Sequence, residues 1–99
     1  MKQIVYHVEA RLDVLEIVEY YEQEGGAKLA DRFTAELEKF VELIARRPES
    51  YSTRVKDVRR ANLRRFPHHV LFRVIDEDTV KILSVKHDSR RPSYGTDRK

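Results

Sequence analysis

The sequence has no cysteine, only three glycines and no long apolar run. Without cysteine, disulfides, thiolate chemistry and zinc sites built on cysteine are excluded. With so few glycines, the chain contains no glycine-rich loop of the kind that binds phosphates. No stretch approaches the roughly 20 apolar residues of a membrane span. The N-terminal segment becomes acidic too early for a secretion signal, so we expect a cytoplasmic protein with no membrane partner.

The length and composition predict one small folded unit. Ninety-nine residues suffice for a single hydrophobic core, so we expect one domain covering residues 1–99. Hydrophobic residues make up 40% of the chain and charged residues 37%. This balance is enough for folding but predicts a modest core.

The charge is divided unevenly along the chain. Residues 1–50 contain 7 Lys and Arg against 11 Asp and Glu, whereas residues 51–99 contain 13 against 6. The two halves therefore carry net charges of −4 and +7. A basic, arginine-rich half attracts polyanions or acidic protein segments.

Residues 10–46 show the periodicity of two amphipathic helices separated by Gly25-Gly26. In the first helix, acidic and basic residues such as Asp13 fill the gaps between apolar ones, and a left-handed glycine cap is expected to end it. The second runs from about Ala27 to Arg46 and stops before Pro48. The tight connection predicts an antiparallel helical hairpin. The two apolar stripes consist of Ala10, Val14, Ile17, Val18 and Tyr21, and of Leu29, Phe33, Leu37, Phe40, Val41 and Ile44.

Short segments rich in β-branched residues predict the strands. Residues 2–6 form the first strand, and residues 48–56 form a polar connector. Three further strands are expected at residues 58–66, 68–75 and 79–85. The acidic turn 76–78 joins the last two as an antiparallel hairpin. From about residue 87 to residue 99 we expect an irregular tail lying over the sheet.

The order strand, helix, helix, strand, strand, strand predicts a two-layer α+β fold. The helical hairpin should cover one face of a small, mainly antiparallel sheet. The opposite face, with its arginine side chains, should be left for solvent or a partner. Along the hairpin strand, Val70, Phe72 and Val74 should point to one face, and Leu71 and Arg73 to the other.

The basic half contains a set of residues suited to metal-free RNA cleavage. That reaction needs a base, an acid and cations beside the phosphorane, which His, Tyr and Arg can supply. Five arginines are expected on strands, and four further candidates follow the last strand. These residues are Arg59, Arg60, Arg64, Arg65 and Arg73, and His87, Arg90, Arg91 and Tyr94.

The same residues have simpler explanations. Strand arginines often belong to a solvated sheet face, His87 can be an ordinary residue at a strand end, and Tyr94 can tie down the tail by packing. Tyr20 and Tyr21 are expected to pack, and His68 and His69 to lie at the surface. Those two histidines point to opposite faces of a strand, so we expect no metal site and no cofactor. From the residues alone, a basic adaptor that binds an acidic partner remains an alternative.

The C-terminal half resembles the RelE/ParE superfamily of toxins. The resemblance lies in Arg59-Arg60, the Phe66-Pro67 step, Leu71-Phe72-Arg73-Val74, and a strand ending at His87 before an arginine-rich tail with Arg90, Arg91, Pro92 and Tyr94. The N-terminal strand and two helices fit in order and length. The resemblance implies a small sheet against a helical hairpin. It also implies a cognate antitoxin whose acidic, disordered segment folds on binding.

The resemblance leaves two targets open. RelE-like toxins cleave mRNA on the ribosome, and there His87, Arg73, Arg90 and Tyr94 would be the catalytic set. ParE-like toxins block DNA gyrase without chemistry. In both cases Arg59, Arg60, Arg64, Arg65 and Arg91 would bind nucleic acid or antitoxin.

Departures from the nuclease pattern favour the ParE branch. His69 stands where such nucleases often carry a catalytic arginine. The connector has only Lys56 in place of a lysine-rich patch. The prediction is therefore a type II toxin, with gyrase favoured as the target over the ribosome.

Overall fold

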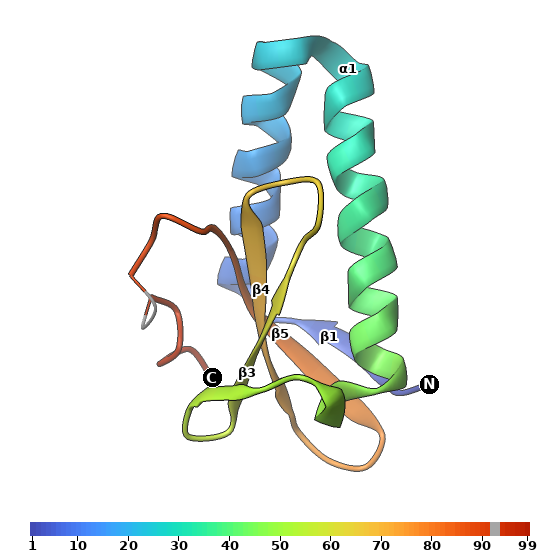
Figure 1. The fold of residues 1–99 in the computed structure, drawn as a ribbon, viewed down its shortest axis with the longest axis vertical. Helices are drawn as coiled ribbons and strands as arrows, with labels where there is room; N and C mark the ends of the chain where they lie inside the picture. Colours follow the sequence, from blue (N-terminus) through green and yellow to red (C-terminus); the bar gives the residue numbers. More distant parts are fainter. Residues whose placement is uncertain (92–93) are drawn as a thin grey trace.

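The computed structural model describes residues 1–91 and 94–99, so Pro92 of the sequence pattern lies outside the described residues. Figure 1 shows a helical hairpin standing on a twisted sheet, with the C-terminal segment on the other side of that sheet. The elements in chain order are β1 (Gln3–Tyr6), α1 (Val8–Arg46), a 3₁₀ turn (Pro48–Ser50), β2 (Thr53–Val55), β3 (Val58–Asn62), β4 (His68–Val74) and β5 (Thr79–His87).

The predicted hairpin is present, as two arms of α1 that meet at Gly26 (Figure 1). We call residues 8–25 the first arm and residues 27–46 the second arm. Gly26 has φ 79° and ψ −177°, a region open essentially to glycine alone. The predicted break is confirmed, but the predicted left-handed cap is wrong. At Gly26 the ψ angle is extended, and the chain reverses direction there. A left-handed cap would have a much smaller ψ.

The described residues form a sheet with the strand order β1-β5-β4-β3-β2. β1 runs parallel to β5, and the other neighbours are antiparallel. β2 lies inside the predicted polar connector, where its exposed residues Thr53–Val55 give no strand-like alternation. β3 ends at Asn62, so the predicted strand 58–66 is too long, whereas β5 continues to His87.

The main core lies between α1 and one face of the sheet. The helical stripes supply Ala10, Phe33, Leu37, Val41 and Ile44, which are at most 3% exposed, and the strands supply Val70, Phe72, Val80, Ile82 and Val85. A bulge in β5 helps to build this core. Leu71 pairs with Ser84 and Phe72 with Ile82, so Leu83 is an extra residue. Ile82 and Val85 both reach the main core as a result.

The opposite face of the sheet has a small core of its own, formed by Val58, Leu71 and Leu83. The C-terminal segment lies against it. A Cβ at Gly95 would come within 2.9 Å of the Ser84 side chain and 3.9 Å of Leu71 Cδ1. The expectation that this face is left open is therefore wrong, because its apolar centre needs the tail as a cover. The expected tail over the sheet is confirmed.

Aromatic rings close the main core at the end near the β3–β4 loop. Tyr21 packs with Phe33, Phe66 and His68, at ring-centroid distances of 5.1 to 5.9 Å. His68 is 5% exposed and His69 is fully buried, so the surface positions expected for them are wrong. Tyr20, expected to pack, is 56% exposed.

Candidate functional site

The first two candidate arginines lie on opposite faces of β3. Arg59 pairs with Phe72 and so shares its face, and its guanidinium donates to the Tyr51 carbonyl. Arg60 lies on the tail side. It donates to Asn62 Oδ1 at 2.9 Å and is 3.5 Å from Asp88 Oδ1. Both side chains are partly buried, and their guanidinium groups already donate hydrogen bonds within the fold. Because they also lie on opposite faces, they form no common basic surface.

Arg64 and Arg65 lie on the β3–β4 loop and not on a strand, which corrects the sequence-based placement. Their backbone N–H groups both donate to Glu36 Oε2, at 2.9 and 2.7 Å. The carboxylate on the second arm therefore fixes the loop. The two side chains are exposed beside that arm, away from the sheet face on which they were expected.

Arg73 forms a two-pronged ion pair with Asp57. Its Nε and Nη2 donate to Asp57 Oδ2 at 3.1 and 3.0 Å. The hydrogen bond from Arg73 lowers the pKa of Asp57. Arg73 pairs with Lys81 near the β4–β5 turn, whereas His87 pairs with His68 at the other end of β4. Five strand positions span about 16 Å, so Arg73 and His87 do not share a site.

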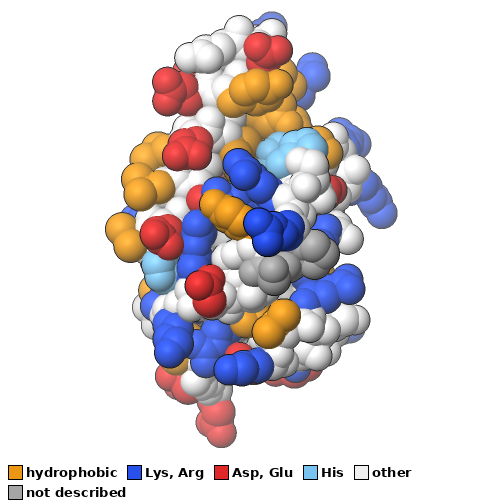
Figure 2. Space-filling model, turned by 90° about the vertical axis from the view of Figure 1, so that its left-hand side faces the viewer, with side chains coloured by type: hydrophobic (Ala, Val, Ile, Leu, Met, Phe, Trp, Pro, Cys, Tyr) orange, Lys and Arg blue, Asp and Glu red, His pale blue; other side chains and the backbone are white. Residues whose placement is uncertain are grey.

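Lysine and arginine side chains gather on the side of the molecule that carries the C-terminal segment (Figure 2). We call Lys86, Arg90, Tyr94 and Arg98 the tail cluster. The Tyr94 ring lies 4.8 Å from Lys86 Nζ, 5.3 Å from the Arg90 guanidinium and 6.0 Å from that of Arg98. An aromatic face among cations is stabilised by cation–π attraction. Tyr94 is 39% exposed, so a partner can still reach it.

A buried carboxylate on the first arm anchors the tail cluster. Asp13 is 4% exposed, and its carboxylate contacts Lys86 Nζ at 2.9 Å and Arg98 Nη1 at 2.7 Å. It also accepts a hydrogen bond from the backbone N–H of Val85 at 3.1 Å. In the sequence, Asp13 stands among the polar residues between apolar ones, and that pattern alone does not indicate this role. The available signal was its position beside the apolar stripe, three residues after Ala10.

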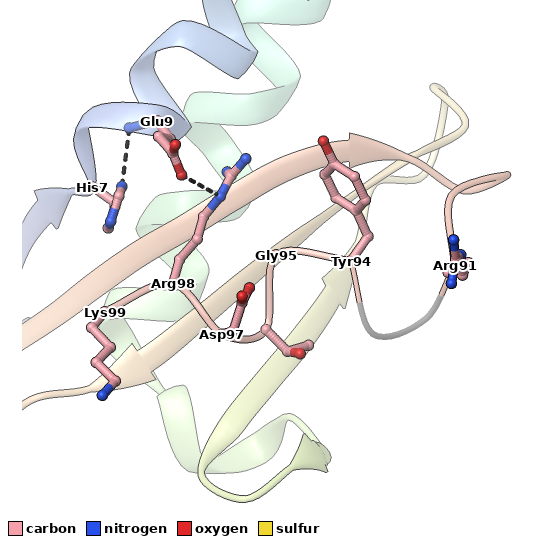
Figure 3. A pocket seen from close by; sticks show the side chains of 9 residues that line it. His7, Glu9, Arg91, Tyr94, Gly95, Asp97, Arg98 and Lys99 are labelled. Atoms are coloured by element: carbon pink, nitrogen blue, oxygen red, sulfur yellow. Dashed lines mark hydrogen bonds and ion pairs between the residues drawn. The ribbon is translucent and has the colours of Figure 1, made fainter.

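Arg98 joins the end of the chain to the same anchor. Besides Asp13, it contacts Glu9 Oε2 at 3.0 Å and donates to the Leu83 carbonyl at 3.0 Å. Figure 3 shows its guanidinium turned toward Glu9, with the Tyr94 ring on the same side of the segment and Arg91 further along. Arg91 and Tyr94 line an open cavity of about 900 Å³ with Arg98. Arg98 was not a candidate, because nothing in the sequence links residue 98 to residue 13.

His87 is exposed at the end of β5. Its Nδ1 accepts a hydrogen bond from the backbone N–H of Ser89 at 3.0 Å. In the neutral imidazole the proton therefore lies on Nε2, which leaves that nitrogen as a donor. The ring lies 5.3 Å from that of His68, on the α1 side of the sheet. With Arg90 it lines a cavity of about 430 Å³ beside Tyr20 and Pro67.

The two buried histidines are neutral near pH 7. Burial, with a smaller contribution from the nearby His87, lowers the pKa of His68 to about 4. Burial also lowers the pKa of His69, although its hydrogen bond to Asp88 opposes that shift. His69 Nδ1 lies 3.1 Å from Asp88 Oδ1, and Asp88 in turn contacts Arg60. These side chains form a polar link between the strands and the start of the tail, with His69 buried and Asp88 exposed.

The structure divides the candidate residues among separate places. Arg90 lies beside both Tyr94 and His87, but those two occupy opposite sides of the sheet. Arg73 lies at the far end of β4. In the described part of the chain, no three His, Asp or Glu side chains are grouped so that they could hold a metal ion. No described helix is long and apolar enough to cross a membrane.

Comparison with known protein families shows to which family this chain belongs. Residues 4–92 match the model of the ParE toxin of the type II toxin–antitoxin system parDE. The chain belongs to the ParE toxin family. It is the toxin component of a type II toxin–antitoxin system, and its partner is a cognate antitoxin. The resemblance to the RelE/ParE superfamily is thereby confirmed.

Solved structures agree on the fold. A chain of the chromosomal ParDE system from P. aeruginosa superposes with a TM-score of 0.76 at 22% identity, covering 88% of this chain and 96% of its own. The isolated RelE toxin of E. coli gives 0.62 at 19% identity, covering 97% and 94%. A mutant E. coli RelE in complex with an antitoxin RelBc peptide gives 0.54 at 19% identity, covering 99% and 95%. No curated protein sequence matches significantly.

Proposed function

We propose that this ParE family toxin arrests growth by binding DNA gyrase in the cytoplasm and performs no chemistry of its own. The observation that carries the proposal is the dispersal of the nuclease candidates. Arg73 is held by Asp57 at one end of β4, and His87 lies at the other. A proton-transferring group acts only within hydrogen-bond reach of the reacting atoms. These two residues therefore do not act on one phosphate in this arrangement.

His69 gives independent support. It stands where ribosome-dependent nucleases of the superfamily often carry an arginine, and here the side chain is fully buried against Asp88. A buried, neutral imidazole neither contacts a phosphate nor stabilises a developing negative charge. Arg90 and Tyr94 of the tail cluster, in contrast, are exposed and offer a cation and an aromatic ring for contacts with a protein or with DNA.

A RelE-like nuclease is the second candidate, favoured by one observation. His87 is exposed with a donor Nε2, and Arg90 lies beside both His87 and Tyr94. In that case His87 would transfer a proton, Arg90 would stabilise the phosphorane and Tyr94 would position a base. Arg73 would have to leave Asp57 to take part.

Two readouts after induction of the toxin alone test the proposal. Gyrase binding predicts intact mRNA by primer extension, together with DNA damage and arrested division. The variant His87→Ala should retain this toxicity. Discrete translation-dependent cuts in mRNA, lost on the order of 100-fold in His87→Ala, would establish the nuclease instead. Unrestrained growth with folded toxin present would refute both and leave a basic adaptor.

A separate experiment tests the binding of the antitoxin partner. Co-expression of the cognate antitoxin should restore growth, because an acidic segment that folds on the toxin covers its basic surfaces. Arg60 and Arg91 are proposed to contribute on the tail side, and Arg64 and Arg65 beside the second arm. Arg59, held to the Tyr51 carbonyl, should contribute least.

A further inference from the structure

The outward face of the first arm carries an apolar stripe that the core does not use. Val8, Leu12 and Leu15 are 68%, 53% and 63% exposed. They follow one another at intervals of four and three residues, so they share one face of the helix. The core residues of this arm, which begin with Ala10, lie on the opposite face. Single exposed apolar residues are ordinary on a surface, but three in one row form a continuous apolar strip.

This stripe is open to a partner. All three side chains stay more than half exposed, so nothing within residues 1–91 and 94–99 covers them. The tail cluster contacts the first arm beside the stripe, where Arg98 binds Glu9 and Asp13. Figure 2 shows hydrophobic side chains along the left-hand edge of the molecule, with acidic side chains next to them. A second chain can approach such an edge without displacing the C-terminal segment.

Unpaired charges of opposite sign flank the stripe. Arg11 lies on one side of it and Glu16 on the other, and both side chains are exposed. Neither has an ion pair in the described part of the chain, whereas Glu9 is held by Arg98. In the notation of a coiled-coil heptad, Leu12 and Leu15 occupy positions a and d, and Arg11 and Glu16 occupy g and e. Those are the positions that form salt bridges between two helices.

We propose that two copies of this chain pair through their first arms, which lie parallel about a two-fold axis. Leu12 then meets Leu12 of the second copy, and Arg11 of each copy meets Glu16 of the other. The symmetry forms this ion pair twice. In an antiparallel pair each flank would meet the same flank of the second copy, so Glu16 would face carboxylates. The charges therefore select the parallel arrangement.

The seam is short, which makes the dimer weak. Val8 to Leu15 spans about 10 Å of helix, and Glu19 follows in the same row, where two carboxylates would meet across the axis. A contact of this size is at the low end of specific interfaces. The pairing stands on the first arm alone and does not depend on the target of the toxin.

Sedimentation velocity of the purified chain from about 5 to about 500 μM tests the pairing. A reversible dimer should form as the concentration rises. Leu12→Glu with Leu15→Glu should weaken it about 10-fold or more. The matched control, Leu43→Glu with Ile75→Glu, adds the same charge at exposed apolar residues outside the first arm and should stay within about 2-fold.

A gain of affinity gives an independent check of the seam. Glu19→Leu removes the facing carboxylates and adds an apolar layer, so it should tighten the dimer about 10-fold. Glu24 is also exposed on the first arm but lies off the row. Glu24→Leu, the control, should change the affinity less than about 2-fold.

A charge exchange tests the predicted ion pair. Arg11→Glu alone places like charges across the seam and should weaken the dimer about 5-fold. Adding Glu16→Arg in the same chain restores opposite charges and should return the affinity to within about 2-fold of the original. Circular dichroism of each variant checks that the fold is intact. Growth arrest on induction, scored separately, tests the toxin function alone.

A single introduced cysteine reports the direction of pairing, because the chain has none of its own. Leu12→Cys should give a disulfide-linked dimer under mild oxidation, since equivalent a positions of a parallel pair lie close enough for a disulfide. Leu43→Cys on the second arm should remain unlinked.

Several results would overturn the proposal. A monomer throughout the concentration range would exclude the dimer, and equal weakening in the Leu12, Leu15 pair and its control would place the contact elsewhere. Cross-linking only between Leu12→Cys and Leu15→Cys chains would show an antiparallel pair. A monomeric toxin that needs Leu12 and Leu15 to bind a co-expressed antitoxin would assign the stripe to that partner instead.

Discussion

Asp13 joins the first arm, the edge of β5 and the C-terminal segment through one buried carboxylate. Its partners Lys86 and Arg98 are themselves only 12% and 13% exposed. Removing one member of a buried ion network leaves uncompensated charges and costs about 3 kcal/mol. We expect Asp13→Asn to lose about this much unfolding free energy in urea denaturation. Asp31→Asn, an exposed change on the second arm, should lose less than about 0.5 kcal/mol. Equal small losses would contradict the anchoring role.

His68 gives the fold a dependence on pH. Its pKa is lowered by burial to about 4 from 6.5. The unfolded chain therefore binds a proton that the folded chain does not, and stability present above pH 6.5 is lost as the pH falls toward 4. The loss amounts to about 3 kcal/mol. His68→Phe, which keeps a ring against Tyr21 and Phe33, should unfold with a shallower pH dependence. An unchanged slope between pH 7 and 4.5 would contradict this assignment.

At the scale of elements, the helical hairpin depends on one glycine. The conformation of Gly26, φ 79° and ψ −177°, costs about 1–3 kcal/mol for a residue with a Cβ. Gly26→Ala should therefore lower the free energy of unfolding by that amount, although no atom would meet the new Cβ. Glu24→Ala, an exposed residue of the same turn, is the control. If both variants lose the same amount, the backbone explanation is wrong.

The helical arms and the β4–β5 hairpin could be predicted because their signals are local. Apolar residues at three- and four-residue spacing gave both stripes, and the acidic turn gave the hairpin, where Asp78 N–H bonds Asp76 Oδ1 at 2.8 Å. β2 and the end of β3 could not be predicted in the same way. The exposed β2 residues are ordered mainly by pairing with β3, and Glu36, 28 residues from Arg64, fixes the loop that follows β3.

At the scale of the whole molecule, stability should be graded across the sheet. β4 is central and β5 has strands on both sides, whereas β2 is a short, exposed edge strand. Amide hydrogen exchange should therefore be slowest in β4 and β5, through global unfolding, and faster in β2, through local opening. Protection in β2 equal to that in β4 would show that the edge strand unfolds only with the core. That result would argue for a tighter coupling than the packing indicates.

The sequence by itself determined the fold class, the family and the chemical character of the candidate residues. These properties follow from periodicity, turn residues and the order of short motifs, all of which are local. The tertiary structure alone decided how the charges are used. It paired Arg60 with Asp88 and Arg73 with Asp57, placed Arg64 and Arg65 around the same cavity as Arg32 and Lys39, and anchored the tail to Asp13. Charge acts over distances in space, so its effect becomes defined only when the folded chain fixes which groups are neighbours.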